Sequence, residues 1–155
     1  MDFPYTLVTD WPKHQTRQRY LPWINIGVRK PSSTKAIWPL GLVDSGAELT
    51  VIDHEVAEEL GLNFKKALKD TITGFGGAKV PVLIVEVEFI LDDGKGKDPI
   101  IYQDFAAFTK NPFPISHPHQ TAIFGTMGLF RKVNKVSFEY PLNFAQSKKR
   151  LLREP

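Results

Sequence analysis

Short runs of apolar, β-branched and aromatic residues, separated by proline and glycine, recur along this chain and constrain its fold more than any other feature. Such runs are typical of β-strands, because branched side chains pack well on a pleated surface and the breaks between them form turns. In residues 20–30, for example, Ile24, Ile26 and Val28 alternate with other residues and share one face. Strands are predicted over 20–30, 35–43, 48–52, 99–109, 121–125 and 135–145, with two more strands inside 70–91.

Two short segments are predicted as helices. Residues 53–62 have Asp53 as a candidate N-cap, Val56 and Leu60 four apart, and Gly61 as the stop signal. The second predicted helix covers residues 126–133. Many short strands with two short helices predict a mainly β fold, a partly closed barrel.

Length and composition indicate one domain of an ordinary globular protein. The chain has 155 residues, of which 42% are hydrophobic and 24% charged. We expect residues 1–19 to form an N-terminal arm, 20–145 the domain and 146–155 a basic tail. No window approaches the roughly 18 apolar residues of a membrane span, and the first residues do not resemble a signal peptide. Without cysteine there is no disulfide framework, so a cytoplasmic location is expected.

The net charge of +3 is modest, and much of it lies in the last residues, "SKKRLLREP". Aromatic residues that could stack on bases do not interleave with these basic residues, so nucleic acid is an unlikely partner. A basic β-barrel that binds nucleic acid would need exposed aromatics beside lysines on one sheet face. The aromatics of this chain mostly share strands with core-like residues.

One stretch, "PLGLVDSGAELTVID" at residues 39–53, raises a chemical question, because an apolar strand leads directly into Asp44. A carboxylate is a poor strand residue and is costly to bury without a partner. In one interpretation Asp-Ser-Gly is only a turn in which Asp44 accepts hydrogen bonds from nearby amides. In the other, a tight loop holds Asp44 so that its carboxylate performs chemistry.

Two other candidate sites are weaker. His117 and His119 lie two apart in a proline-rich loop without a visible third ligand, so no metal site is predicted. Gly74, Gly76 and Gly77 lack the Lys and Ser/Thr of a phosphate-binding loop, and no long helix begins there. A mobile hairpin tip fits these glycines better.

Asp44 has no histidine or cysteine beside it, so a nucleophile triad is not indicated. It could instead be half of a pair of carboxylates that share a proton and activate water. The motif occurs once in the chain, so the second carboxylate would have to come from another subunit about a two-fold axis. Gly46 and Ala47 would leave room for two loops to approach each other, and the Ser45 hydroxyl could brace them.

Three segments together resemble the retropepsin-like aspartic proteases. "LVDSGAELTVI" resembles the active-site stretch of that family, and "TITGFGGAKV" resembles its glycine-rich flap. "TAIFGTMGLFRKVNKVSF" resembles its apolar-apolar-Gly strand end, C-terminal helix and last strand. The segments occur in family order over roughly residues 20–145.

The resemblance implies a role for each matching position. Asp44 matches the catalytic aspartate, Ser45 the hydroxyl that locks the two loops, and Gly46 and Ala47 the floor beneath the substrate backbone. Glu48 falls where the family places an acid that binds peptide amides. The flap that closes over substrate is matched by Gly74, Phe75, Gly76 and Gly77. The strand beneath the loop is matched by Ile123, Phe124 and Gly125.

The resemblance also implies a small, soluble, homodimeric aspartic endopeptidase that cleaves a polypeptide and needs no metal or cofactor. The segment 135–145 is then the best candidate for an intersubunit strand. The chain departs from the family at Thr126 and Met127, where Arg followed by Asp or Asn is frequent, which puts the family's supporting charge network in doubt. The alternative is a retropepsin fold that binds peptides or dimerises without useful turnover. Length and the single Asp-Ser-Gly exclude a two-domain pepsin-like enzyme.

Overall fold

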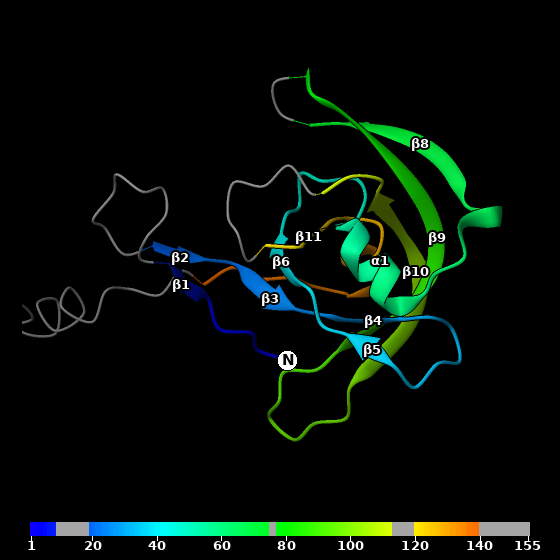
Figure 1. The fold of residues 1–155 in the computed structure, drawn as a ribbon. Coiled ribbons are helices and arrows are strands. Elements are labelled where there is room, and N and C mark those ends of the chain that lie inside the picture. Colours follow the sequence, from blue (N-terminus) through cyan, green and yellow to red (C-terminus); the bar gives the residue numbers. More distant parts are fainter. Residues whose placement is uncertain (9–18, 75–76, 113–119, 140–155) are drawn as a thin grey trace, which may run out of the picture.

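A computed structural model of the chain describes residues 1–8, 19–74, 77–112 and 120–139. Within these ranges the structure is mainly β, as predicted, with a sheet that curls into a half-barrel (Figure 1). The strands are β1 (Thr6–Val8), β2 (Arg19–Leu21), β3 (Trp23–Asn25), β4 (Gly27–Arg29), β5 (Ala36–Ile37), β6 (Leu40–Val43), β7 (Val51–Ile52), β8 (Leu68–Thr73), β9 (Lys79–Leu91), β10 (Ile100–Thr109) and β11 (Ala122–Phe124). The helical elements are α1 (His54–Leu60) and the 3-10 turns η1 (Phe64–Lys66) and η3 (Phe130–Lys132).

The main sheet has the strand order β3-β6-β11-β7-β10-β9-β4-β5, and β8 pairs with β9. The single strand predicted over 20–30 is divided into β2, β3 and β4, with breaks at Pro22 and Ile26. β3 pairs with β6 near one end of the sheet, whereas β4 pairs with β9 near the other. The same stretch therefore joins both sides of the sheet, and this connection curls it.

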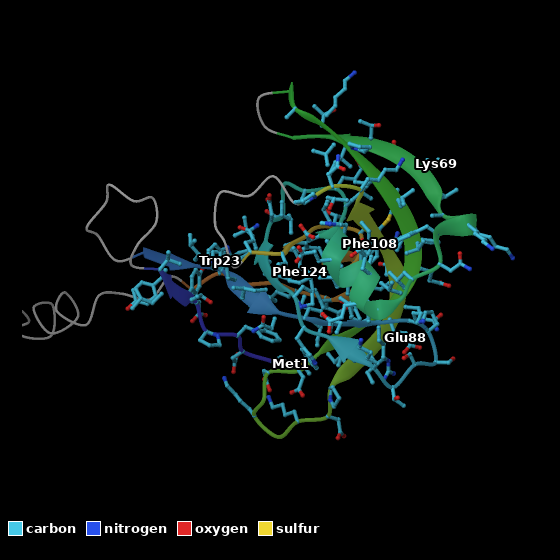
Figure 2. All side chains as sticks on the ribbon, in the orientation of Figure 1. Met1, Trp23, Lys69, Glu88, Phe108 and Phe124 are labelled. Atoms are coloured by element: carbon cyan, nitrogen blue, oxygen red, sulfur yellow. The ribbon has the colours of Figure 1, made fainter. Side chains whose placement is uncertain are left out.

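The core fills the inside of this curl. Phe89, Phe108 and Phe124 are its largest fully buried side chains, and Figure 2 labels two of them close to α1. Helix α1 adds Val56 and Leu60 to the same cluster.

The predicted limits of this helix are confirmed. The Asp53 side chain accepts a hydrogen bond from the Glu55 N–H at 2.9 Å, and Gly61 ends the helix with a φ of +61°.

The second predicted helix is largely wrong. Residues 126–133 contain only the three-residue η3, because Gly128 has a φ of +99°, outside the range of a right-handed helix. Residues 135–139 of the predicted last strand belong to no strand in this single chain, and 140–145 lie outside the described residues.

Part of the predicted N-terminal arm is regular. β1 pairs antiparallel with β2 in a small separate sheet, with Leu7 opposite Tyr20. Further along, the Asp2 N–H donates to the Asp93 carboxylate at 3.1 Å and Lys95 approaches Asp2 at 3.3 Å. The first residues therefore contact the turn between β9 and β10.

Gly41 offers a test of the packing between β6 and β11. A Cβ at this position would lie 2.4 Å from the Phe124 ring and 2.8 Å from the Ala122 Cβ, and both neighbours are fully buried. We expect Gly41→Ala to lower the free energy of unfolding by about 1–3 kcal/mol through overpacking, measured by urea denaturation. Gly74→Ala, whose Cβ would meet nothing closer than 3.8 Å, is the control and should change stability little. Equal stability of the two variants would contradict this packing.

Candidate active site

Asp44 begins a tight turn directly after β6. Its N–H donates to the Phe124 carbonyl at 3.0 Å, and the Ala47 N–H donates to the Asp44 carbonyl at 3.2 Å. The Gly46 N–H donates to Oδ1 of Asp44 at 2.8 Å. The turn interpretation is therefore geometrically correct, and the bond from the Gly46 N–H holds one oxygen of the carboxylate.

The turn presents its side chains toward solvent. Asp44 and Ala47 are partly buried, whereas Ser45, Gly46 and Glu48 are exposed. Within the described ranges no protein group donates a hydrogen bond to Oδ2 of Asp44. One oxygen of the carboxylate is thus used to hold the loop, and the other is available for a ligand or a second group.

A second segment, residues 125–128, lies against this loop and holds it. The N–H groups of Thr126 and Met127 donate to the carbonyls of Ala47 and Glu48, each at 2.8 Å. The Thr50 N–H donates back to the Met127 carbonyl, also at 2.8 Å. These bonds form a short parallel pairing of two irregular segments, so the position of the loop depends on the position of residues 125–128.

Gly125 allows the two segments to approach this closely. A Cβ there would lie 2.5 Å from the Leu49 carbonyl oxygen and 2.6 Å from that of Ala47. Its N–H donates to the Thr50 hydroxyl at 3.1 Å, and Thr50 is fully buried. The residue pattern indicated Thr50 only as a strand residue, and nothing in the sequence near it predicted this contact.

The strand beneath the loop is placed as the resemblance implied. β11, which contains Ile123 and Phe124, lies between β6 and β7, and Phe124 pairs with Val43 in a parallel register. Gly125 follows directly at the end of this strand.

Three side chains that the sequence did not single out lie around Gly128, of which two bind it directly and the third binds one of those two. The Tyr102 hydroxyl donates to the Gly128 carbonyl at 2.8 Å, and the Gly128 N–H donates to Asp104 Oδ2 at 3.1 Å. Arg131 pairs with Asp104 through Nε at 2.6 Å and through a second guanidinium nitrogen. Burial raises the pKa of Tyr102, so its hydroxyl stays protonated and remains a donor.

The predicted flap is a hairpin formed by β8 and β9. Thr73 pairs with Lys79, the Gly74 N–H donates to the Ala78 carbonyl at 2.8 Å, and Gly77 has a φ of +82°. Phe75 and Gly76 lie outside the described residues. The hairpin extends beyond the barrel at the top of Figure 1.

His117 and His119 also lie outside the described residues. In the part of the chain that the structure describes, no group of three or more His, Asp or Glu side chains could hold a metal ion. No helix in these ranges has the length and apolar character needed to cross a membrane.

No protein-family model and no curated protein matches the sequence. Among solved structures, the EIAV protease complexed with the inhibitor HBY-793 is similar, with a TM-score of 0.50 and 16% sequence identity. The match covers 83% of this chain and 98% of that chain. The chain has the retropepsin-like fold. The fold implied by the sequence resemblance is therefore confirmed, and an identity this low extends the comparison to fold alone.

Thr50 tests the contact between the two segments. Thr50→Val preserves the shape of the side chain but removes the acceptor of the buried Gly125 N–H, which should cost about 1–3 kcal/mol of unfolding free energy. Urea denaturation measures the change, with the exposed Thr73→Val as the control. An unchanged stability for Thr50→Val would show that this hydrogen bond does not hold Gly125.

Proposed function

We propose that this protein is an aspartic endopeptidase whose active site forms at a two-fold axis from Asp44 of two identical subunits. The observation that carries the proposal is the Asp44 turn, in which one carboxylate oxygen is held by the Gly46 N–H while the side chain stays partly exposed. The turn lies on a retropepsin-like fold and directly follows β6.

The chemistry requires two such carboxylates. One ionised Asp44 would draw a proton from water, and the other, protonated, would polarise the scissile carbonyl. Two adjacent carboxylates cannot both ionise easily, so the rate should pass through a maximum at acidic pH. A site of this kind needs no metal or cofactor.

The surroundings of Asp44 suit an extended peptide. The exposed Gly46 and Glu48 lie beside the carboxylate on the same turn, where backbone amides of a substrate could be bound. The β8–β9 hairpin would cover the substrate as a flap, and Ser45 would brace the two loops at the axis. These roles come from the resemblance and form part of the proposal.

An open cavity of about 930 Å³ supports an association between chains. It is lined by residues of both ends of the described chain, including Tyr5 and Phe138, and by apolar side chains such as Val43, Leu129 and Val136. The lining is mainly apolar, so a protein partner that covered it would remove apolar side chains from water. We propose a second copy of this chain as that partner and the cytoplasm as its location.

The second candidate function is a peptide-binding or dimerisation module of the same fold with little turnover. The observation that favours it is the presence of Thr126 and Met127 after Gly125, because neither brings a charge to the loop. The experiments that follow separate the two functions.

Asp44→Asn tests the catalytic assignment. The amide can still accept the Gly46 N–H, so fold and dimer should persist, whereas the shared proton is lost. We expect peptide-library cleavage to fall by roughly a hundredfold or more. Asp98→Asn, in the exposed turn before β10, is the matched control and should cleave normally. Cleavage by the Asp44 variant at the rate of the natural sequence would assign the activity to another group.

Dilution tests the shared site. If each site needs Asp44 from two subunits, a monomer has no complete site. Activity per mole of protein should therefore decrease once the protein concentration is below the dimer dissociation constant, as mass action requires. Excess Asp44→Asn chain should also inhibit the unchanged protein, because mixed dimers carry one functional carboxylate. A monomer in sedimentation whose specific activity is insensitive to dilution and to the variant would contradict the two-subunit site.

A further inference from the structure

Both backbone polar groups of Gly128 are bound by side chains of one strand. Tyr102 and Asp104 lie two residues apart on β10, so they share one face of it. The Tyr102 hydroxyl donates a hydrogen bond to the Gly128 carbonyl, and the Asp104 carboxylate accepts one from the Gly128 N–H. We name this arrangement of Tyr102, Asp104 and Arg131 around Gly128 the glycine clamp.

Asp104 is the centre of the glycine clamp. Its side chain is only 1% exposed, and a buried carboxylate without partners would be strongly destabilising. Here it accepts from Arg131, from the Gly128 N–H at 3.1 Å and from the Phe105 N–H at 2.8 Å. A buried ion pair adds little net stability compared with apolar packing, so what it provides here is a defined geometry.

Thr50 packs closely against Gly128, in addition to the bonds of the clamp. A Cβ at Gly128 would lie 2.4 Å from the Thr50 hydroxyl oxygen, so the backbone is packed directly against Thr50. Its φ of +99° is a backbone conformation that residues other than glycine rarely adopt. The clamp therefore fixes a backbone position that already touches the residue that binds Gly125.

A continuous series of hydrogen bonds connects the clamp with the Asp44 turn. Gly125 and Gly128 form a bridge, and the Arg131 N–H donates to the Thr126 carbonyl at 3.1 Å. The next residues, Thr126 and Met127, donate to the turn itself at Ala47 and Glu48. Each step is a direct contact, from the Asp104 carboxylate to the loop that carries Asp44.

We propose that Asp104, together with Tyr102 and Arg131, is a positioning residue that sets the position and orientation of the Asp44 turn. The inference rests on the proposed peptidase function for its kinetic part. Two carboxylates that must share a proton across an axis tolerate little displacement, and a misplacement of about 1 Å from a distant mutation can cost on the order of a hundredfold in rate.

The kinetic test compares Asp104→Asn and Tyr102→Phe with Glu88→Gln. The control removes another Arg–carboxylate pair, Arg29 with Glu88 at 2.6 Å, which joins β4 to β9. Glu88 also accepts from Gln103 on β10 at 3.3 Å, but it has no hydrogen bond to Tyr102, Asp104 or Arg131. We expect kcat per folded dimer to fall roughly ten- to a hundredfold in both clamp variants, with KM little changed, and to stay normal in the control. Tyr102→Phe removes one hydroxyl and keeps the test usable if Asp104→Asn does not fold.

Two substitutions of Arg131 test whether a conservative replacement restores part of the activity. Arg131→Lys keeps a positive charge near Asp104 but loses the fork of two bonds, so it should retain more activity than Arg131→Met. Lower melting temperatures with unchanged kcat per folded dimer would show that the clamp stabilises the fold only, and would overturn the proposal.

A second readout does not depend on activity. In the Asp44→Asn background, amide hydrogen exchange at Thr126 and Met127 reports the bonds to the turn. We expect faster exchange with Asp104→Asn or Tyr102→Phe and no change with Glu88→Gln. If the unchanged protein cleaves no peptide, the proposed function fails, and these exchange rates still decide whether the clamp holds the turn. Equal exchange in all variants would overturn it.

Discussion

The backbone hydrogen bonds between the Asp44 turn and residues 125–128 are the interaction on which the site depends. Neither segment belongs to a long strand or helix, so its N–H and carbonyl groups must find partners elsewhere once they are buried. Each segment supplies those partners for the other, through Thr126 to Ala47, Met127 to Glu48 and Thr50 to Met127. A displacement of either segment would therefore break several bonds at once, and this mutual dependence holds the carboxylate in place.

The two segments can form these hydrogen bonds only because their backbones lie very close together, and glycine, which has no Cβ, allows this. At Gly125 and Gly128 a Cβ would lie within 2.6 Å of a neighbouring atom, and at Gly41 it would enter the Phe124 ring. All three positions lie around β11, in the layer directly below the turn. These are the closest approaches found at any glycine of the described residues, whereas a Cβ at Gly74 or Gly77 in the β8–β9 hairpin would meet nothing closer than 3.8 Å.

Thr126 and Met127 stand where retropepsin-like sequences often have charged residues, and in this structure another charged pair contacts the same segment. No charge is available at these two positions, but the buried pair of Asp104 and Arg131 reaches the same segment from β10 and η3. Because Asp104 also accepts the Gly128 N–H, this pair acts directly on the backbone that supports the turn. A retropepsin-like fold can therefore fix its loop with a charged pair located elsewhere in the chain.

The sequence by itself determined the features whose causes are local. Alternation and turn residues predicted a mainly β fold, Asp53 and Gly61 marked the ends of α1, and Asp-Ser-Gly predicted the Asp44 turn. The tertiary structure alone decided the breaks at Pro22 and Ile26, the loss of helix around Gly128, and the glycine clamp. Tyr102 and Asp104 lie more than twenty residues from the glycine they hold, and no local period connects them. A hydrogen bond between distant segments leaves no periodic trace in the sequence, so only the folded chain shows it.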